Sequence, residues 1–426
     1  MLDIAIVEGC RTPFAKAFGA LATVPPEELG RITAEAVLAR AHVTADDVDQ
    51  VVFGSVATPA DAANIARVIA LKTGIPQDRI AHTVQRNCAS GMEAVTTAAQ
   101  LIQLGEAKVV LAGGTESMSR IPLLYNPEAT ALFMKLGRAK SFWQRLSALL
   151  RFRLRHLKPV LAIQQGLTDP VSGLIMGATA EILAEEFHIS RVEQDEFALA
   201  SHTKAISAQK HGLLQQEIVP VTETGERRAV LEDLGPRHGQ SLQALAKLKP
   251  IFKEDGTVTV GNSCQVTDGA AAVVLMPGEQ ARAEGRNPLG YLRAYAYAGC
   301  DPRRMGLGPV YATSKVFERT GLTMKDIDLV EINEAFAAQV LADEKAFASD
   351  EFARNELNRQ QRLGEIDPTK LNVNGGAIAL GHPVGATGTR LIITLLKELH
   401  RRGLRRGLAT LCVGGGQGGA VVVETE

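Results

Sequence analysis

The sequence predicts an α/β protein in which two halves repeat one plan and a large insertion separates them. In the first half, a β-rich run at 48–56 precedes a helical pattern at 89–102, and an apolar strand at 107–115 then ends in paired glycines. Strands that alternate with helices of this length are typical of βαβ units around a largely parallel sheet.

The same order recurs near the C-terminus. A β run at 327–333 is followed by a helical pattern at 386–402 and by a strand at 407–416 that again ends in glycines. Any α/β protein shows some alternation of this kind. The matched placement of Cys88 and His382 before helices favours an internal duplication, with the reactive groups near its axis.

The segment between the halves, about 120–250, differs from them in its sequence pattern. It contains helical patterns at 178–187 and 191–205, and a strand pattern returns at 261–276. An insertion of this length predicts a functional lid or subdomain, because structureless loops of such length are uncommon. A polar stretch at 343–367 with alternating charge predicts a solvated helical insertion.

Composition and charge exclude several classes of protein. The 426 residues predict two or three structural units, and 46% hydrophobic with 22% charged residues is ordinary for a globular protein. The net charge of −1 argues against a nucleic-acid partner. The sequence has no secretory leader pattern and no long apolar run, so we expect a cytoplasmic protein.

The cysteines indicate free thiols rather than a disulfide framework. They are five in number and share no C-x-x-C spacing, which predicts a reducing compartment and no metal site. These cysteines are Cys10, Cys88, Cys264, Cys300 and Cys412.

Four short motifs place a functional side chain beside small residues. They are N-C-A-S-G-M around Cys88, N-E-A-F-A from Asn333, G-G-A-I-A-L-G-H-P-V-G around His382 and C-V-G-G-G-Q-G-G from Cys412. Glycine and alanine let a substrate approach the backbone closely. Two thiols and an imidazole in such settings indicate covalent thioester chemistry, with separate nucleophile and acid/base groups.

These motifs, in this order, resemble those of the thiolase family over about residues 3–425. The resemblance implies a duplicated five-layered αβαβα fold with an inserted loop domain. It divides the chain into an N-terminal half at 1–120 and 250–278, a loop domain at 121–249 and a C-terminal half at 283–426.

The resemblance also implies the roles of the motif residues. Cys88 is then the nucleophile, with a pKa lowered by the helix N-terminus, and His382 is a neutral imidazole that deprotonates it. Cys412 is the acid/base, with a modestly lowered pKa. Asn333 holds a water that forms one oxyanion hole with His382, and the backbone N–H groups of Cys88 and Gly414 form the second.

Met176, Ser263 and Lys249 are expected to contact substrate. Two positions depart from many relatives. Ile175 stands where biosynthetic acetoacetyl-CoA thiolases carry histidine, which favours a degradative enzyme of broader chain length. Cys264 stands where a serine often contacts pantetheine, so this contact is open.

The predicted function is 3-ketoacyl-CoA thiolase activity in fatty-acid β-oxidation, through an acyl-enzyme on Cys88. Coenzyme A is a co-substrate, and neither a tightly bound cofactor nor a metal is expected. An acetyl-CoA acetyltransferase and a non-catalytic lipid- or partner-binding homologue are the alternatives, while Cys412 disfavours a ketoacyl synthase. The resemblance implies a homodimer or homotetramer.

A basic segment lies inside the insertion. Residues 129–168 hold eight Lys and Arg and neither Asp nor Glu. A basic amphipathic helix at 141–158 predicts contact with a membrane surface or with a hydratase/dehydrogenase α subunit, because the segment resembles that of thiolase subunits in trifunctional β-oxidation complexes. Packing on the chain's own core and a basic lip for CoA phosphates are alternatives. The predicted apolar stripe comprises Trp143, Leu146, Leu150, Leu154 and Leu157.

Overall fold

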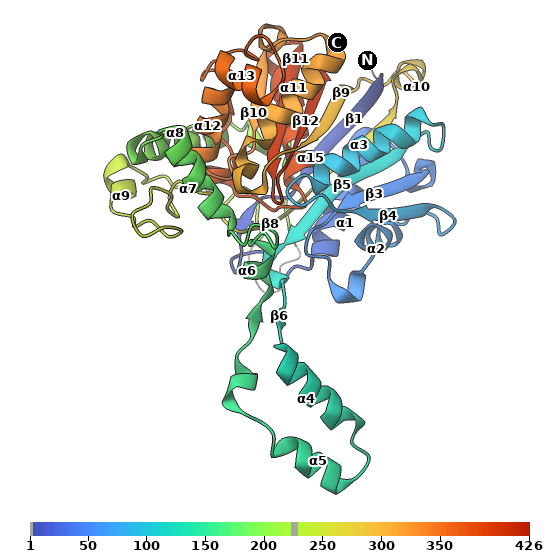
Figure 1. Cartoon of the computed structure of the whole chain (residues 1–426). Coiled ribbons are helices and arrows are strands. Elements are labelled where there is room, and N and C mark those ends of the chain that lie inside the picture. The colour runs from blue at the N-terminus through green and yellow to red at the C-terminus, as the bar shows by residue number, and fades with distance from the viewer. Residues whose placement is uncertain (1–2, 223–228) are drawn as a thin grey trace.

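The computed structural model describes residues 3–222 and 229–426. Residues 1–2 of the expected N-terminal half and 223–228 of the expected loop domain therefore lie outside the described residues. The chain forms a body of layered sheet and helices, from which a long helical arm projects (Figure 1).

The strands of the body form one hydrogen-bonded series in the order β10-β11-β12-β9-β1-β8-β5-β3-β4, with β2 paired to β8. The N-terminal and C-terminal strands meet where Ile4–Ile6 of β1 pair with β9. The strands are β1 (Ile4–Arg11), β2 (Ala15–Lys16), β3 (Gln50–Gly54), β4 (Ile80–Val84), β5 (Val110–Ser117), β8 (Thr267–Pro277), β9 (Gly290–Gly299), β10 (Leu329–Ile332), β11 (Arg406–Val413) and β12 (Gln417–Glu424).

The expectation of a largely parallel sheet is wrong. Parallel pairing joins β3 to β4, β3 to β5 and β10 to β11, whereas β8, β1, β9 and β12 pair antiparallel with their neighbours. The turn after β11 explains part of this difference. Gly415 and Gly416 have φ of 89° and 78°, which glycine adopts without strain, so the chain reverses at once and β12 returns antiparallel.

Helices cover both outer faces and fill the middle of the body, as the predicted αβαβα arrangement requires (Figure 1). Helices α1 (Pro26–Ala41) and α2 (Ile65–Lys72) pack on the outer face of the N-terminal strands, and α11 (Gly308–Thr320) packs on β9 and β12. Helices α3 (Ser90–Gln103) and α15 (Thr387–Arg402) pack against each other between the two groups of strands.

Glycine lets the two central helices approach closely. A Cβ at Gly388 of α15 would lie 2.3 Å from the backbone nitrogen of Met92 in α3, a distance that no side chain can occupy. Because Cys88 and His382 each precede one of these helices, their close packing brings the two motifs to the same region.

The remaining elements belong mainly to the insertion and to the outer layers. They are β6 (Leu123–Leu124), α4 (Pro127–Arg138), α5 (Phe142–Leu149), β7 (Val160–Leu161), α6 (Ala162–Gly166), α7 (Met176–Glu186), α8 (Arg191–Lys210), α9 (Leu242–Ala246), α10 (Gly278–Ala283), α12 (Ala337–Phe347), α13 (Asp350–Glu356) and α14 (Ala377–Leu380).

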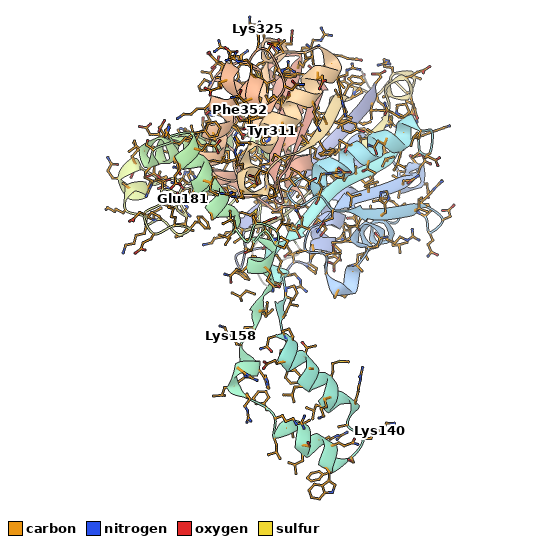
Figure 2. All side chains as sticks on the ribbon, viewed as in Figure 1. Lys140, Lys158, Glu181, Tyr311, Lys325 and Phe352 are labelled. Carbon is orange, nitrogen blue, oxygen red and sulfur yellow. The ribbon has the colours of Figure 1, made fainter. Side chains whose placement is uncertain are left out.

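The predicted solvated helical insertion at 343–367 is only partly correct. Asp343 is fully buried in α12, and Phe352 of α13 packs 6.0 Å from the ring of Tyr311 (Figure 2). The apolar residues of this stretch draw both helices onto the body, and its charges remain exposed mainly in α13 and after it, whereas Asp343 is buried. The part after α13 is an irregular loop with exposed polar side chains, in which Leu363 and Ile366 are buried.

The arm consists of α4 and α5 on a stem formed by the paired strands β6 and β7. The single helix expected at 141–158 is wrong, because α5 ends at Leu149 and a separate short 3-10 turn spans Leu154–Leu157. Arg151 and Arg155 would be four residues apart on a continued helix, where like charges repel. Arg155 instead pairs with Glu128 of α4 at 2.7 Å.

Among the residues that the structure describes, no helix is both long and apolar enough to cross a membrane.

Candidate active site

Cys88 lies in the last turn before α3 and is half-buried. The preceding residue, Asn87, has φ of 43°, and its side-chain amide donates to the carbonyl oxygen of Gly414 at 2.7 Å. This contact ties the Cys88 loop to the glycine turn after β11. The backbone N–H groups of Cys88 and Gly414 lie near the Cys88 sulfur, where they act to lower the pKa of the thiol. They are the two groups that the sequence predicts for the second oxyanion hole.

His382 lies in the loop between α14 and α15, directly after Gly381, whose φ is 105°. Its Nδ1 lies 2.6 Å from Oγ1 of Thr387, and that hydroxyl donates to the carbonyl oxygen of Pro383 at 3.1 Å. Because the hydroxyl has one proton to give, it accepts from Nδ1–H. The lone pair of His382 is therefore on Nε2.

Asn333 follows β10 and is fully buried. Its Nδ2 lies 3.5 Å from Nε2 of His382, and its Oδ1 has no hydrogen-bond partner within the described residues. A buried amide oxygen without a partner is costly, and a bound water is the usual remedy. The structure thus brings these two predicted residues together and leaves Asn333 a free acceptor for a water.

Cys412 is the second-to-last residue of β11 and is buried. Burial is the main cause that raises the pKa of its thiol, and a negative charge on Cys88 would raise it further. Cys412 does not itself line either of the cavities described below.

The expected lowering of both thiol pKa values is wrong. Burial raises the pKa of the Cys88 thiol by more than the two N–H groups lower it, and burial also raises that of Cys412 well above its usual range. Burial and the charge of Arg390 lower the pKa of His382 to about 3. The resting site accordingly holds neutral thiols beside a neutral imidazole, which is the base that the motif predicts.

Two cavities meet at this site. One, of about 310 Å³, is lined by His382 and Ser263, and the other, of about 530 Å³, is lined by Cys88 and Gly414. Four residues line both cavities, so the thiol and the imidazole face a continuous space. The shared residues are Met118, Leu167, Met176 and Val384.

Of the three residues predicted to bind substrate, two line a cavity of the site and one does not. Met176 and Ser263 line the smaller cavity, whereas Lys249 is exposed and lines neither. Cys264 lines the smaller cavity, where burial raises its pKa to about 12. Ser263 donates its hydroxyl to the backbone oxygen of Thr259 at 2.7 Å, so its lone pairs remain available to a ligand.

The sequence analysis did not identify three residues that belong to the site. Lys16 and Arg237 are exposed cations on the smaller cavity, and Thr387 sets the tautomer of His382. Thr387 lies only five residues after the histidine, so its spacing could have indicated a contact. Nothing in the local sequence distinguishes Lys16 or Arg237 from other surface cations.

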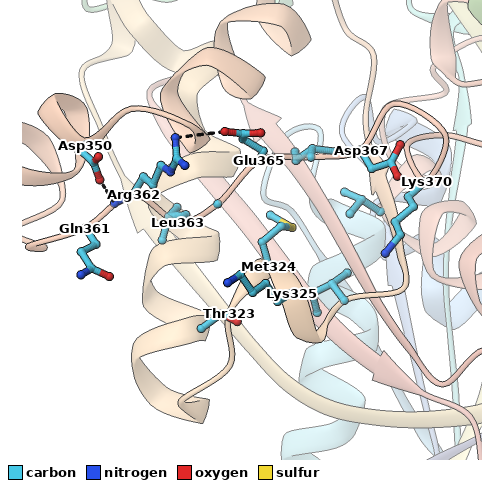
Figure 3. A pocket seen from close by; sticks show the side chains of 14 residues that line it. Thr323, Met324, Lys325, Asp350, Gln361, Arg362, Leu363, Glu365, Asp367 and Lys370 are labelled. Carbon is cyan, nitrogen blue, oxygen red and sulfur yellow. Dashed lines mark hydrogen bonds and ion pairs between the residues drawn. The ribbon is translucent and has the colours of Figure 1, made fainter.

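A further cavity, of about 710 Å³, lies beside β10 under the loop at 361–367 (Figure 3). Its acidic groups are already paired, since Asp350 accepts from the backbone N–H of Arg362 and Glu365 forms an ion pair with the Arg362 side chain. None of the predicted site residues lines it. Over residues 3–222 and 229–426, no group of three or more His, Cys, Asp or Glu could hold a metal ion.

The fold and this site define a thiolase, and the chain belongs to the thiolase family. Residues 4–279 match the thiolase N-terminal domain and residues 286–425 match the thiolase C-terminal domain.

Individual relatives agree with this assignment. The 3-ketoacyl-CoA thiolases of Photorhabdus laumondii and Yersinia pestis are each 43% identical over 99% of this chain and 97% of their own length. The crystal structure of human mitochondrial 3-ketoacyl-CoA thiolase in complex with CoA is 37% identical, with a TM-score of 0.85 over 99% of this chain and 98% of that one. The Bacillus anthracis acetyl-CoA acetyltransferase is 39% identical, with a TM-score of 0.88 over 100% and 99% of the two chains.

Proposed function

We propose that the protein is a 3-ketoacyl-CoA thiolase, which cleaves 3-ketoacyl-CoA with CoA to acetyl-CoA and a shortened acyl-CoA. The observation that carries this proposal is a half-buried thiol, Cys88, in a cavity that adjoins the one lined by His382, the partner of Asn333.

In the first half of the reaction, Nε2 of His382 takes the proton of Cys88, and the sulfur attacks the 3-keto carbon. The neutral imidazole and its unprotonated Nε2 suit this step. The bond between C2 and C3 then breaks and leaves the acyl group on Cys88. Cys412 protonates C2 of the departing acetyl-CoA.

In the second half, a molecule of CoA loses its thiol proton to the acid/base group and attacks the thioester on Cys88. The backbone N–H groups of Cys88 and Gly414 lower the pKa of the Cys88 thiol and so lie near the reacting sulfur, which supports their role as donors to the oxyanion of this step. CoA leaves as the shortened acyl-CoA, and His382 returns to the thiolate of Cys88 the proton that it took in the first half, which restores the free thiol.

We assign the smaller cavity to the pantetheine arm of CoA and the larger one to the acyl chain. Lys16 and Arg237 supply positive charge on the smaller cavity for the phosphates of CoA. The larger cavity extends from Cys88 to Ile121 and Ile163 at the base of the arm. Its volume of about 530 Å³ exceeds what an acetyl group needs, which favours longer acyl chains over the condensation of two acetyl-CoA molecules.

The test is thiolysis of 3-ketoacyl-CoA of several lengths, together with mass spectrometry of the acyl-enzyme. Cys88→Ala should form no acyl-enzyme. Cys412→Ala should retain some acyl transfer between CoA molecules but lose cleavage of the carbon–carbon bond. Cys300→Ala, a half-buried thiol that lines neither cavity, is the matched control.

Full thiolysis by Cys88→Ala or Cys412→Ala would reject the proposed roles. A wild-type protein that takes no acyl group on Cys88 would instead support the non-catalytic homologue. Turnover restricted to the four-carbon substrate would support the acetyltransferase.

We also propose that the arm associates with an anionic membrane surface or with a hydratase/dehydrogenase subunit. Trp143, Leu150 and Leu154, three residues of the predicted stripe, are 74%, 71% and 83% exposed, so the chain's own core does not cover them. Lys140 and Lys158 lie on the same projection (Figure 2). Apolar and basic groups on one projection suit an anionic interface. No basic residue of the arm lines either catalytic cavity, which disfavours a lip for CoA phosphates.

Co-sedimentation with vesicles that contain anionic lipid, and pull-down with a hydratase/dehydrogenase subunit, test this association. Deletion of 141–158 should abolish it while thiolysis of short substrates continues. Wild-type protein that binds neither partner would refute it.

A homodimer or homotetramer is the assembly that we propose. Strand β4 pairs with β3 on one side, and the described residues supply no strand on its other side. Ile80 at its start is 62% exposed. An open edge of this kind can pair with a second copy. Light scattering coupled to size exclusion measures the assembly, and a monomer would refute it.

A further inference from the structure

Glu334 is a buried carboxylate directly after Asn333, and it binds donors from remote segments. Its Oε1 accepts from Nδ2 of Asn372 at 2.8 Å. Its Oε2 accepts from the hydroxyl of Ser201 at 2.6 Å and from the backbone N–H of Ile378 at 3.2 Å. One carboxylate thus joins the end of β10, helix α8 of the insertion and helix α14.

The segment that carries His382 is fixed to β10 through the same carboxylate. Asn372 exchanges two hydrogen bonds of 2.9 Å with the backbone of Ile332, as a neighbouring strand would. A Cβ at Gly376 would lie 2.2 Å from Cδ of Glu334, so the segment passes directly over the carboxylate. Ile378, which donates to Glu334, lies only four residues before His382.

Glu334 does not reach the reacting groups. It lines a separate cavity of about 310 Å³, which contains neither Cys88 nor His382. It therefore cannot exchange a proton with substrate directly. Its contacts are with the two segments that hold Asn333 and His382, and these residues are 49 positions apart in the sequence.

We propose that Glu334 is a positioning residue that sets the separation of 3.5 Å between Nδ2 of Asn333 and Nε2 of His382. The inference rests on the proposed thiolase function. Movement of either group would misplace the water and the imidazole that face a developing enolate. A displacement of about 1 Å in such a site can reduce the rate by about 100-fold.

Glu334→Gln is the test, because it conserves size and removes one acceptor. All three partners of Glu334 are hydrogen-bond donors. The NH2 group of the glutamine would therefore face at least one donor and could not accept its hydrogen bond. We expect kcat for thiolysis to fall about 10- to 100-fold and KM for CoA to change less than about twofold. Exchange of acetyl between acetyl-CoA and labelled CoA, which uses the N–H groups of Cys88 and Gly414, should fall by less than thiolysis.

Glu196→Gln is the matched control, because Glu196 is an exposed carboxylate on the same cavity. It should leave both reactions unchanged. Ser201→Ala removes a hydroxyl that donates to Glu334 and accepts from the backbone N–H of Gly376 at 3.2 Å. Asn372 and Ile378 still donate to Glu334 in this variant, so we expect a smaller loss in the same direction. This milder variant keeps the test decisive if Glu334→Gln does not fold.

Three outcomes overturn the inference. The first is wild-type kcat in Glu334→Gln. The second is equal loss of thiolysis and exchange, which indicates a general structural role. The third, where Glu334→Gln does not fold, is an unchanged ratio of thiolysis to exchange in Ser201→Ala. A wild-type protein that exchanges acetyl groups but cleaves no 3-ketoacyl-CoA would reject the proposed function itself, and this result is distinct from the other three.

Discussion

Replacing Arg11 by methionine should destabilise the protein and weaken its binding of CoA. The guanidinium is fully buried and donates from Nε to Glu217 at 2.7 Å, and from Nη1 and Nη2 to Asp233 at 2.6 and 2.8 Å. The substitution would leave two buried carboxylates without their cation. Removal of one partner from such a group costs about 3 to 5 kcal/mol.

This cost can be converted into a shift in melting temperature. A chain of 426 residues has an entropy of unfolding of roughly 0.9 kcal/mol/K, so the loss corresponds to about 3 to 6 °C. The carboxylate of Asp233 also accepts from the backbone N–H of Phe14 at 2.8 Å, and the next residue, Leu234, donates its N–H to the backbone oxygen of Phe14 at 3.0 Å. These contacts hold the segment that leads to Arg237 on the smaller cavity. We therefore expect KM for CoA to rise several-fold.

Calorimetry and steady-state kinetics with CoA measure the two effects. Arg362→Met, which breaks an exposed ion pair of 3.1 Å with Glu365, should cost no more than about 0.5 kcal/mol. Adding Glu217→Gln and Asp233→Asn to Arg11→Met should recover part of the stability, because no buried charge then lacks a partner. A loss below about 1 kcal/mol in Arg11→Met would refute the reasoning.

Three further predictions concern the site. Gly385→Ala should reduce thiolysis by about 100-fold, because its Cβ would lie 2.6 Å from the backbone oxygen of Thr115, whereas Gly137→Ala, with open space around it, should be silent in the same assay. His382 should remain neutral in the folded protein down to about pH 4, as measured by NMR titration. Its pKa of about 3 in the folded protein lies below the value of about 6.5 in the unfolded chain, so the stability that this group contributes should be lost as the pH falls below about 6.5. A titration midpoint near pH 6.5 in the folded protein would contradict this. Ile163→Trp should reduce turnover of sixteen-carbon relative to four-carbon 3-ketoacyl-CoA, and equal loss of both would place the acyl chain elsewhere.

The sequence by itself predicted the duplicated order of strands and helices in the two halves and named the candidate reactive groups. The patterns at 89–102 and 191–205 appear as α3 and α8, because apolar periodicity and capping are local properties. Cys88, His382 and Cys412 could be named because each has small residues beside it in the chain, and those neighbours form part of the same short motif.

Only the tertiary structure decided the protonation of these groups and the space around them. Helix position alone predicts a lowered pKa for Cys88, but desolvation by segments remote in sequence outweighs it. The tertiary structure also brings together residues that lie far apart in the chain. Examples are the contact of Asn333 with His382, the hydrogen bond of Asn372 to Glu334, and the positions of Lys16 and Arg237 on the smaller cavity. Burial and electrostatic fields are sums over all neighbouring segments, so no local pattern contains them.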